Sequence, residues 1–230
     1  MKLAVIPARG GSKRILRKNI KPFGGLPMIS WSIRAALTSN CFDRIIVSTD
    51  DTEIASVAIE HGAEAPFFRP ANLSDDHTGT IPVVAHAIEW QNQHGEKATK
   101  VCCIYPTAPF IISADLQYGL QVLETTRANY AFSVTSYAFP IQRAIQITPN
   151  DRVAMFQPEH FNTRSQDLPK AWHDAGQFYW GLAEAWLAGK EVFGHESAPV
   201  PLPRHRVQDI DTLEDWERAE LMHRTWLQHS

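Results

Sequence analysis

A glycine pair surrounded by cations near the start of the chain is the strongest chemical signal in this sequence. Residues 7–14 read PARGGSKR, and residues 17–19 read RKN. Adjacent glycines let the backbone approach a ligand closely and direct successive N–H groups at an anion. The five cations of this segment stand in a chain whose formal net charge is −3. The pattern predicts a polyphosphate site, with a solvated basic turn as the alternative, and it matches neither G-x-G-x-x-G nor G-x-x-x-x-G-K-[ST].

A second signal is the pair of carboxylates in Asp209-Ile210-Asp211. In an extended segment, residues two apart face the same way, so both aspartates point to one side and Ile210 points to the core. Two convergent carboxylates suit Mg2+, which prefers oxygen ligands and keeps waters and substrate phosphates around it. The alternative is that Asp211 only caps the final helix beside Thr212, while Asp209 is a surface charge.

The elements that must position these groups alternate between strand and helix in the first half of the chain. We expect strands over residues 2–7, 44–49, 101–105, 130–135 and 178–181. We expect helices over residues 27–38, 51–61, 81–93, 113–125 (with Ser113 as N-cap) and 212–227 (with Thr212 and Asp215 as a capping box). This alternation predicts a doubly wound, mostly parallel sheet with helices on both faces. Such sheets bind ligands at the carboxyl ends of their strands, where the glycine loop lies.

The pattern changes in the second half of the chain. Residues 143–147 and 153–156 flank the turn signal TPND, which predicts a hairpin. The stretch 157–175 is polar, aromatic and irregular, and a long loop of this kind is usually functional or packed against another subunit. Residues 204–206 (RHR) suit either a structural turn or a phosphate contact.

Composition limits the class of protein. The 230 residues, 44% hydrophobic and 20% charged, are sufficient for one domain spanning residues 1–230. The slightly negative net charge argues against a non-specific nucleic-acid binder or a basic membrane-surface protein. The three cysteines form no disulfide framework, and we expect Cys102 and Cys103 to be core residues of a protein of the reducing cytoplasm. No apolar run is long enough for a signal peptide or a membrane-spanning helix.

Several short segments in order resemble one family. They read IPARGGSK at 6–13, KN at 18–19, FDRIIVSTD at 42–50, RPA at 69–71, PTAP at 106–109 and QDIDT at 208–212. Together they resemble the sugar-acid cytidylyltransferases, the CMP-sialic acid synthetase family, over essentially the whole chain. Within that family, FNTRSQDL at 161–168 and HDAGQFY at 173–179 are similar to the pseudaminic acid branch.

The resemblance implies a fold and an activity. The fold would be the Rossmann variant of the nucleotide-diphospho-sugar transferases, with a dimerisation extension at about residues 137–175. The enzyme would be a Mg2+-dependent homodimer that joins CTP to a nine-carbon 2-keto sugar acid, pseudaminic acid, and releases pyrophosphate. The product would serve bacterial surface or flagellin glycosylation. The alternatives are the same reaction on N-acetylneuraminic, legionaminic or 3-deoxy-octulosonic acid, or a non-catalytic CTP-binding module.

The resemblance also implies residue roles. The catalytic residues would be Arg9, Lys18 and Asp211, and the metal would be held by Asp209 and Asp211. Either Asp211 or a metal-bound hydroxide would take the proton of the sugar hydroxyl. The nucleotide would be bound by Ala8, Arg9, Gly10, Gly11, Ser12, Lys18, Asn19, Arg69, Thr80 and Tyr105. Tyr105 is a departure, since members that act on sialic acid commonly carry glutamine there. The sugar would be bound by Gln142, Arg143, Arg164, His173 and Gln177, with a purely structural subunit contact as the alternative for the long loop. Trp172 and Trp180 flank that region and are further candidates.

Overall fold

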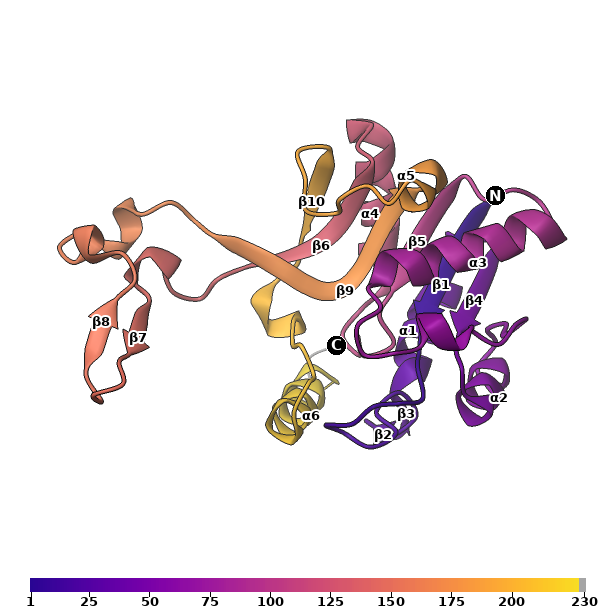
Figure 1. Cartoon of the computed structure of the whole chain (residues 1–230), viewed down its shortest axis with the longest axis horizontal. Helices are drawn as coiled ribbons and strands as arrows, with labels where there is room; N and C mark the ends of the chain where they lie inside the picture. Colours follow the sequence, from indigo (N-terminus) through magenta and orange to yellow (C-terminus); the bar gives the residue numbers. More distant parts are fainter. Residues whose placement is uncertain (228–230) are drawn as a thin grey trace.

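A six-stranded sheet runs through the molecule in the order β10-β6-β9-β5-β1-β4 (Figure 1). The structure is a computed structural model that describes residues 1–227. The sheet strands are β1 (Lys2–Pro7), β4 (Arg44–Ser48), β5 (Lys100–Ile104), β6 (Tyr130–Ser136), β9 (Trp172–Leu182) and β10 (Ser197–Pro201). Two small hairpins lie outside it, β2 (Pro22–Phe23) with β3 (Leu26–Pro27) and β7 (Ile145–Ile147) with β8 (Val153–Met155). The helices are α1 (Met28–Ser39), α2 (Thr52–Glu60), α3 (Thr80–His94), α4 (Ser113–Thr126), α5 (Ala183–Leu187) and α6 (Leu213–Leu227).

The predicted mostly parallel sheet is confirmed, with one strand as the exception. β1 pairs in parallel with β4 and β5, and β10 pairs in parallel with β6. β9 is antiparallel to both β5 and β6, and it bends as it leaves the body of the molecule (Figure 1). β10 was not expected from the sequence. Its Pro199 and Pro201 carry no N–H, a composition that a sheet tolerates at its edge.

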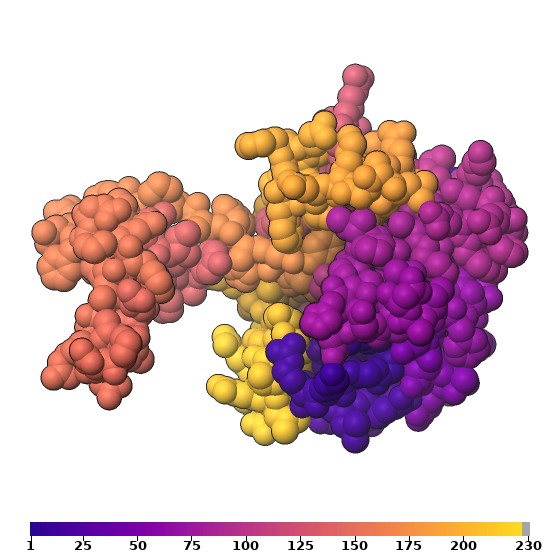
Figure 2. All heavy atoms as spheres, in the orientation of Figure 1, coloured from indigo at the N-terminus to yellow at the C-terminus, as the bar shows by residue number. Residues whose placement is uncertain are grey.

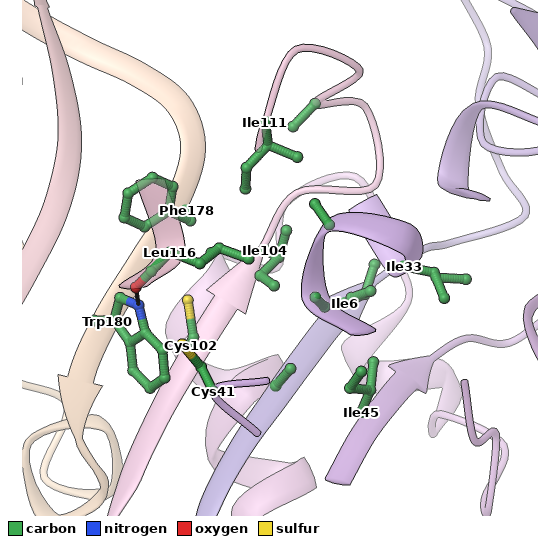
Figure 3. Packing of buried hydrophobic residues seen from close by; sticks show 14 of the residues in the cluster. Ile6, Ile33, Cys41, Ile45, Cys102, Ile104, Ile111, Leu116, Phe178 and Trp180 are labelled. Carbon is green, nitrogen blue, oxygen red and sulfur yellow. Dashed lines mark hydrogen bonds between the residues drawn. The ribbon is translucent and has the colours of Figure 1, made fainter. Parts of the chain in front are cut away.

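Helices cover both faces of the sheet, as expected. α1 and α4 pack against each other on one face, and α3 and α5 pack against each other on the other. Figure 3 shows the first core, where Trp180 donates its Nε1–H to the carbonyl of Leu116. Cys102 faces this core and Cys103 faces the opposite one, and both are completely buried, which confirms their expected role in packing. Trp180 is likewise a core residue.

Of the two predicted helix caps, the one at α6 is confirmed and the one at α4 is wrong. Thr212 and Asp215 form the predicted reciprocal cap of α6, because each accepts the other's backbone N–H, at 2.8 and 3.2 Å. Ser113 is not the N-cap of α4, since it is already helical. The carboxylate of Asp115 instead accepts the N–H of Ile112 at 3.3 Å.

An extension leaves the sheet between β6 and β9 and carries the predicted hairpin (Figure 1). Figure 2 shows it standing clear of the body beside α6. The irregular segment is shorter than expected, because residues 172–175 already belong to β9. The exposed apolar side chains of the whole extension include Phe139, Ile147 and Phe161, which are 82%, 76% and 69% exposed. Within residues 1–227, no helix has the length and apolar character needed to cross a lipid bilayer.

Candidate functional site

The glycine loop leaves the carboxyl end of β1 and is held against the neighbouring strand β4. The N–H of Ala8 donates to the carbonyl of Ser48 at 2.9 Å, and the N–H of Gly10 donates to Asp50 Oδ1 at 2.9 Å. Asn19, which is 5% exposed, donates its side-chain amide to the carbonyl of Arg9 at 2.9 Å. A Cβ atom at Gly10 would lie 2.6 Å from Asp51 Oδ2, so the close approach of the two loops requires glycine there.

The cations of this loop line a polar pocket of about 210 Å³. Its lining includes Arg9, Ser12, Lys13, Arg14, Lys18, Asn19, Pro106, Thr107 and Asp211. Arg17 does not line it, because its guanidinium pairs with Asp51 and Glu53 at the start of α2. The pocket therefore gathers four cations of the loop with one carboxylate from the far end of the chain.

Two of these cations share a carboxylate that the sequence analysis did not single out. Arg9 and Lys13 both form ion pairs with Asp76, in the loop before α3. These two hydrogen-bonded cations lower the pKa of Asp76 to about 2. No local signal marks Asp76, since it lies in an ordinary polar loop and only the fold brings it to the glycine loop.

Lys18 joins the glycine loop to the acidic pair. Its Nζ donates to the carbonyl of Ile210 at 2.6 Å and lies 3.3 Å from Asp211 Oδ1. Arg14 lies 3.0 Å from the same oxygen of Asp211. Segments 192 residues apart in the sequence thus form one site.

In the acidic segment, Ile210 is completely buried, so it points to the core as predicted. Asp211 lines the polar pocket, and Asp209 lines a larger cleft of about 1310 Å³. Partial desolvation and the neighbouring Asp211 raise the pKa of Asp209, and no cation in residues 1–227 forms an ion pair with it. An unneutralised carboxylate beside a second one fits a divalent cation such as Mg2+.

The residues expected at the base and ribose lie beside the loop. Arg69 is 7% exposed and donates to the carbonyl of Ser48 at 3.1 Å, whereas its Nε is buried without a partner among the described residues. Burial lowers the pKa of this guanidinium. Thr80 Oγ1 lies 3.1 Å from the hydroxyl of Tyr105. Tyr105 lines both the large cleft and a smaller cavity of about 430 Å³, so it forms part of the wall that separates them.

The candidate sugar residues divide into two groups. His173 lines the large cleft together with Asp209. Gln142, Arg143 and Arg164 lie on the extension instead, and none of them lines that cleft within the described part of one chain. Gln142 donates to the carbonyl of Pro169 at 3.2 Å.

Gln177 is 3% exposed and donates its side-chain amide to the carbonyl of Arg206 at 2.5 Å. The guanidinium of Arg206 in turn pairs with Asp115, so this arginine has a structural partner. Arg204 and His205 line the large cleft. Trp172, which is 49% exposed, lies at the base of the extension and does not line the cleft.

The chain is similar over most of its length to known cytidylyltransferases. A family model described as "Cytidylyltransferase" matches residues 3–180. The chain is 45% identical over 222 residues to the pseudaminic acid cytidylyltransferase of Campylobacter jejuni subsp. jejuni serotype O:2, covering 96% of each chain. It is 31% identical to the CMP-N,N'-diacetyllegionaminic acid synthase of Legionella pneumophila, covering 95% of this chain and 94% of the relative.

Among solved structures, the fold resembles CMP:2-keto-3-deoxy-manno-octonic acid synthetase complexed with CTP. The TM-score is 0.70 at 16% identity, and the alignment covers 97% of this chain and 98% of the other. The likeness in fold agrees with the family match, which runs from β1 into β9. This protein therefore belongs to the cytidylyltransferase family and is a nucleotidyltransferase.

Proposed function

We propose that the protein transfers CMP from CTP to pseudaminic acid and releases pyrophosphate. The observation that carries this proposal is the contact of Lys18 with Ile210 and Asp211, which places a cationic phosphate pocket directly beside a carboxylate pair. The choice of sugar is supported by the 45% identity to the Campylobacter jejuni enzyme over 96% of both chains.

The triphosphate would lie on the glycine loop. The backbone of Gly10, Gly11 and Ser12 would face it, and Arg9 and Lys18 would meet the negative charge that grows on the departing pyrophosphate. Asp76 would compete with a phosphate oxygen for Arg9, because NH1 of this guanidinium is paired with the carboxylate. Arg9 and Lys18 are the proposed catalytic cations.

The nucleoside would lie toward β4 and α3. Ala8 and Asn19 hold the backbone of the loop there, and Arg69 has a buried Nε that still lacks a partner among the described residues. Thr80 and Tyr105 offer hydroxyl groups on the same side. These residues would recognise the ribose and the cytosine by hydrogen bonding.

The chemical step would be an attack by the anomeric hydroxyl of the sugar on the α-phosphorus. One oxygen–phosphorus bond forms, the bond to pyrophosphate breaks, and the hydroxyl proton passes to the carboxylate of Asp211. Mg2+ held by Asp209 and Asp211 would neutralise phosphate charge during this step.

The sugar acid would occupy the large cleft between Asp209 and His173. Because Gln177 is buried, it would support the sugar site from the core side of the cleft and not from the rim. Gln142, Arg143 and Arg164 would reach a site only in a second copy of the chain. A homodimer through the extension is therefore part of the proposal, and it is supported by the exposed Phe139, Ile147 and Phe161.

The test is pyrophosphate release with CTP and Mg2+ on four acids: pseudaminic, N-acetylneuraminic, legionaminic and 3-deoxy-octulosonic acid. We expect release with pseudaminic acid and a loss of about 1000-fold in Asp211→Asn. The control is Asp43→Asn, because Asp43 is a carboxylate at the opposite end of β1, where it accepts the N–H of Lys2 at 2.6 Å. Release with another acid alone would overturn the choice of sugar. Binding of CTP without release for any of the four would point to a non-catalytic module.

A further inference from the structure

Asp174, on β9, lies where the large cleft and the smaller cavity meet. Together with Tyr105, it lines both spaces. The carboxylate is fixed from two sides, because the hydroxyl of Tyr179 donates to Oδ2 and the N–H of Gly176 donates to Oδ1 at 2.9 Å. The side chain therefore has a defined position at this junction.

This carboxylate has no compensating positive charge. No lysine, arginine or histidine within residues 1–227 forms an ion pair with Asp174. The side chains around it, Cys103 and Tyr179, are buried and uncharged, and burial together with Asp174 raises the pKa of both. A charge in such surroundings is costly unless hydrogen-bond donors satisfy it. The two protein donors leave acceptor capacity on both oxygens, since a carboxylate has about four lone-pair sites.

The space beside Asp174 is mainly apolar. The smaller cavity, of about 430 Å³, is lined by Thr80, Ile81, Tyr105, Asp174, Tyr179, Trp186, Glu191, Val192 and Phe193. A group that suits this arrangement has an apolar end for the cavity and an N–H donor for the carboxylate. An acylamino group meets both requirements, because its methyl group is apolar and its amide carries one N–H.

We propose that Asp174 is a specificity-determining residue that accepts the N–H of an acylamino group on the sugar acid. The inference rests on the proposed function, since it takes the sugar acid to occupy the cleft that Asp209 and Asp174 both line. Asp174 selects acids that bear such a group over acids that carry hydrogen in its place, and the apolar cavity beside it disfavours acids that carry only a hydroxyl. It reads the substrate at a distance from the phosphate pocket, whose lining does not include it.

The experiment compares wild-type protein with Asp174→Asn, which keeps the size of the side chain but removes its charge. We expect kcat/KM for pseudaminic acid to fall by about 30-fold, because the hydrogen bond loses the charge of its acceptor, while KM for CTP stays within about twofold. The Ki of 3-deoxy-octulosonic acid, which has no N–H, should not change. Asp43→Asn is the matched control and should behave as wild type.

Each outcome is decisive. An unchanged kcat/KM for pseudaminic acid in Asp174→Asn would overturn the inference, and so would an equal loss for CTP and sugar, which indicates a structural role. An equal weakening of the octulosonic acid would show that a hydroxyl is read and would remove the acylamino assignment. If Asp174→Asn does not fold, Asp174→Glu must still raise KM for the sugar alone, and an unchanged KM would refute the role. Failure of the wild type on every acid would instead overturn the proposed function.

Discussion

Replacing Asp115 with alanine is expected to lower the free energy of unfolding and to displace the acidic pair, Asp209 and Asp211. Arg206 NH1 lies 2.5 Å from Asp115 Oδ2, and NH2 lies 2.9 Å from Oδ1. The two side chains are only 12% and 9% exposed. In Asp115→Ala the guanidinium of Arg206 keeps its hydrogen bond to the carbonyl of Phe110, at 3.4 Å, but loses its carboxylate partner. An uncompensated buried charge costs about 3–5 kcal/mol, which corresponds to roughly 10 °C in Tm for a chain of this length.

The assay is urea unfolding followed by tryptophan fluorescence, with thermal unfolding as a second measurement at the same protein concentration. Lys190→Ala is the control, because its pair with Glu196 is 45% and 72% exposed and should contribute less than about 1 kcal/mol. The double variant Asp115→Leu/Arg206→Met should recover most of the lost stability. A loss below about 1 kcal/mol in Asp115→Ala would refute the reasoning that this pair anchors the segment before Asp209.

Three further predictions concern the glycine loop and α6. Asp76→Asn should lower KM for CTP in steady-state kinetics, because it frees the phosphate cations, and a higher KM would contradict the idea that this carboxylate competes with the triphosphate. His223 is 1% exposed and burial lowers its pKa, so the unfolded chain takes up a proton first as the pH falls below about 6.5. Tm should therefore drop between pH 7.5 and 5.5, and His223→Phe should reduce that drop; an unaltered pH dependence would exclude His223 as its source. Gly10→Ala should lower the free energy of unfolding by about 1–3 kcal/mol, since its Cβ would lie 2.6 Å from Asp51, whereas Gly11→Ala has nothing within 4 Å and should leave Tm unchanged. Equal Tm values for the two variants would show that the close approach is not required.

Much of the scaffold could be predicted from the sequence because its signals are local. The apolar run of β1, the turn signal before β8 and the reciprocal cap of Thr212 and Asp215 each depend on residues only a few positions apart. The glycine pair and its cations likewise form a contiguous segment, so the phosphate chemistry they suggest does not depend on the rest of the fold. The role of the two cysteines in the core also follows from strand alternation alone.

Other features could be decided only by the tertiary structure, because they depend on which distant segments meet. Strand pairing made β9 antiparallel and added β10, whose proline-rich sequence carries little strand signal. The partners of the charged residues could not be predicted from the sequence either. Arg17 forms an ion pair at the start of α2, and Asp76 forms ion pairs with two cations of the glycine loop. No sequence signal marks Asp174. Its proposed role depends on its position between two cavities, which only the fold creates. Residue types and spacing thus determined the chemistry that is possible, whereas the sheet topology determined which of those groups share a site, since contact between remote side chains exists only after the chain has folded.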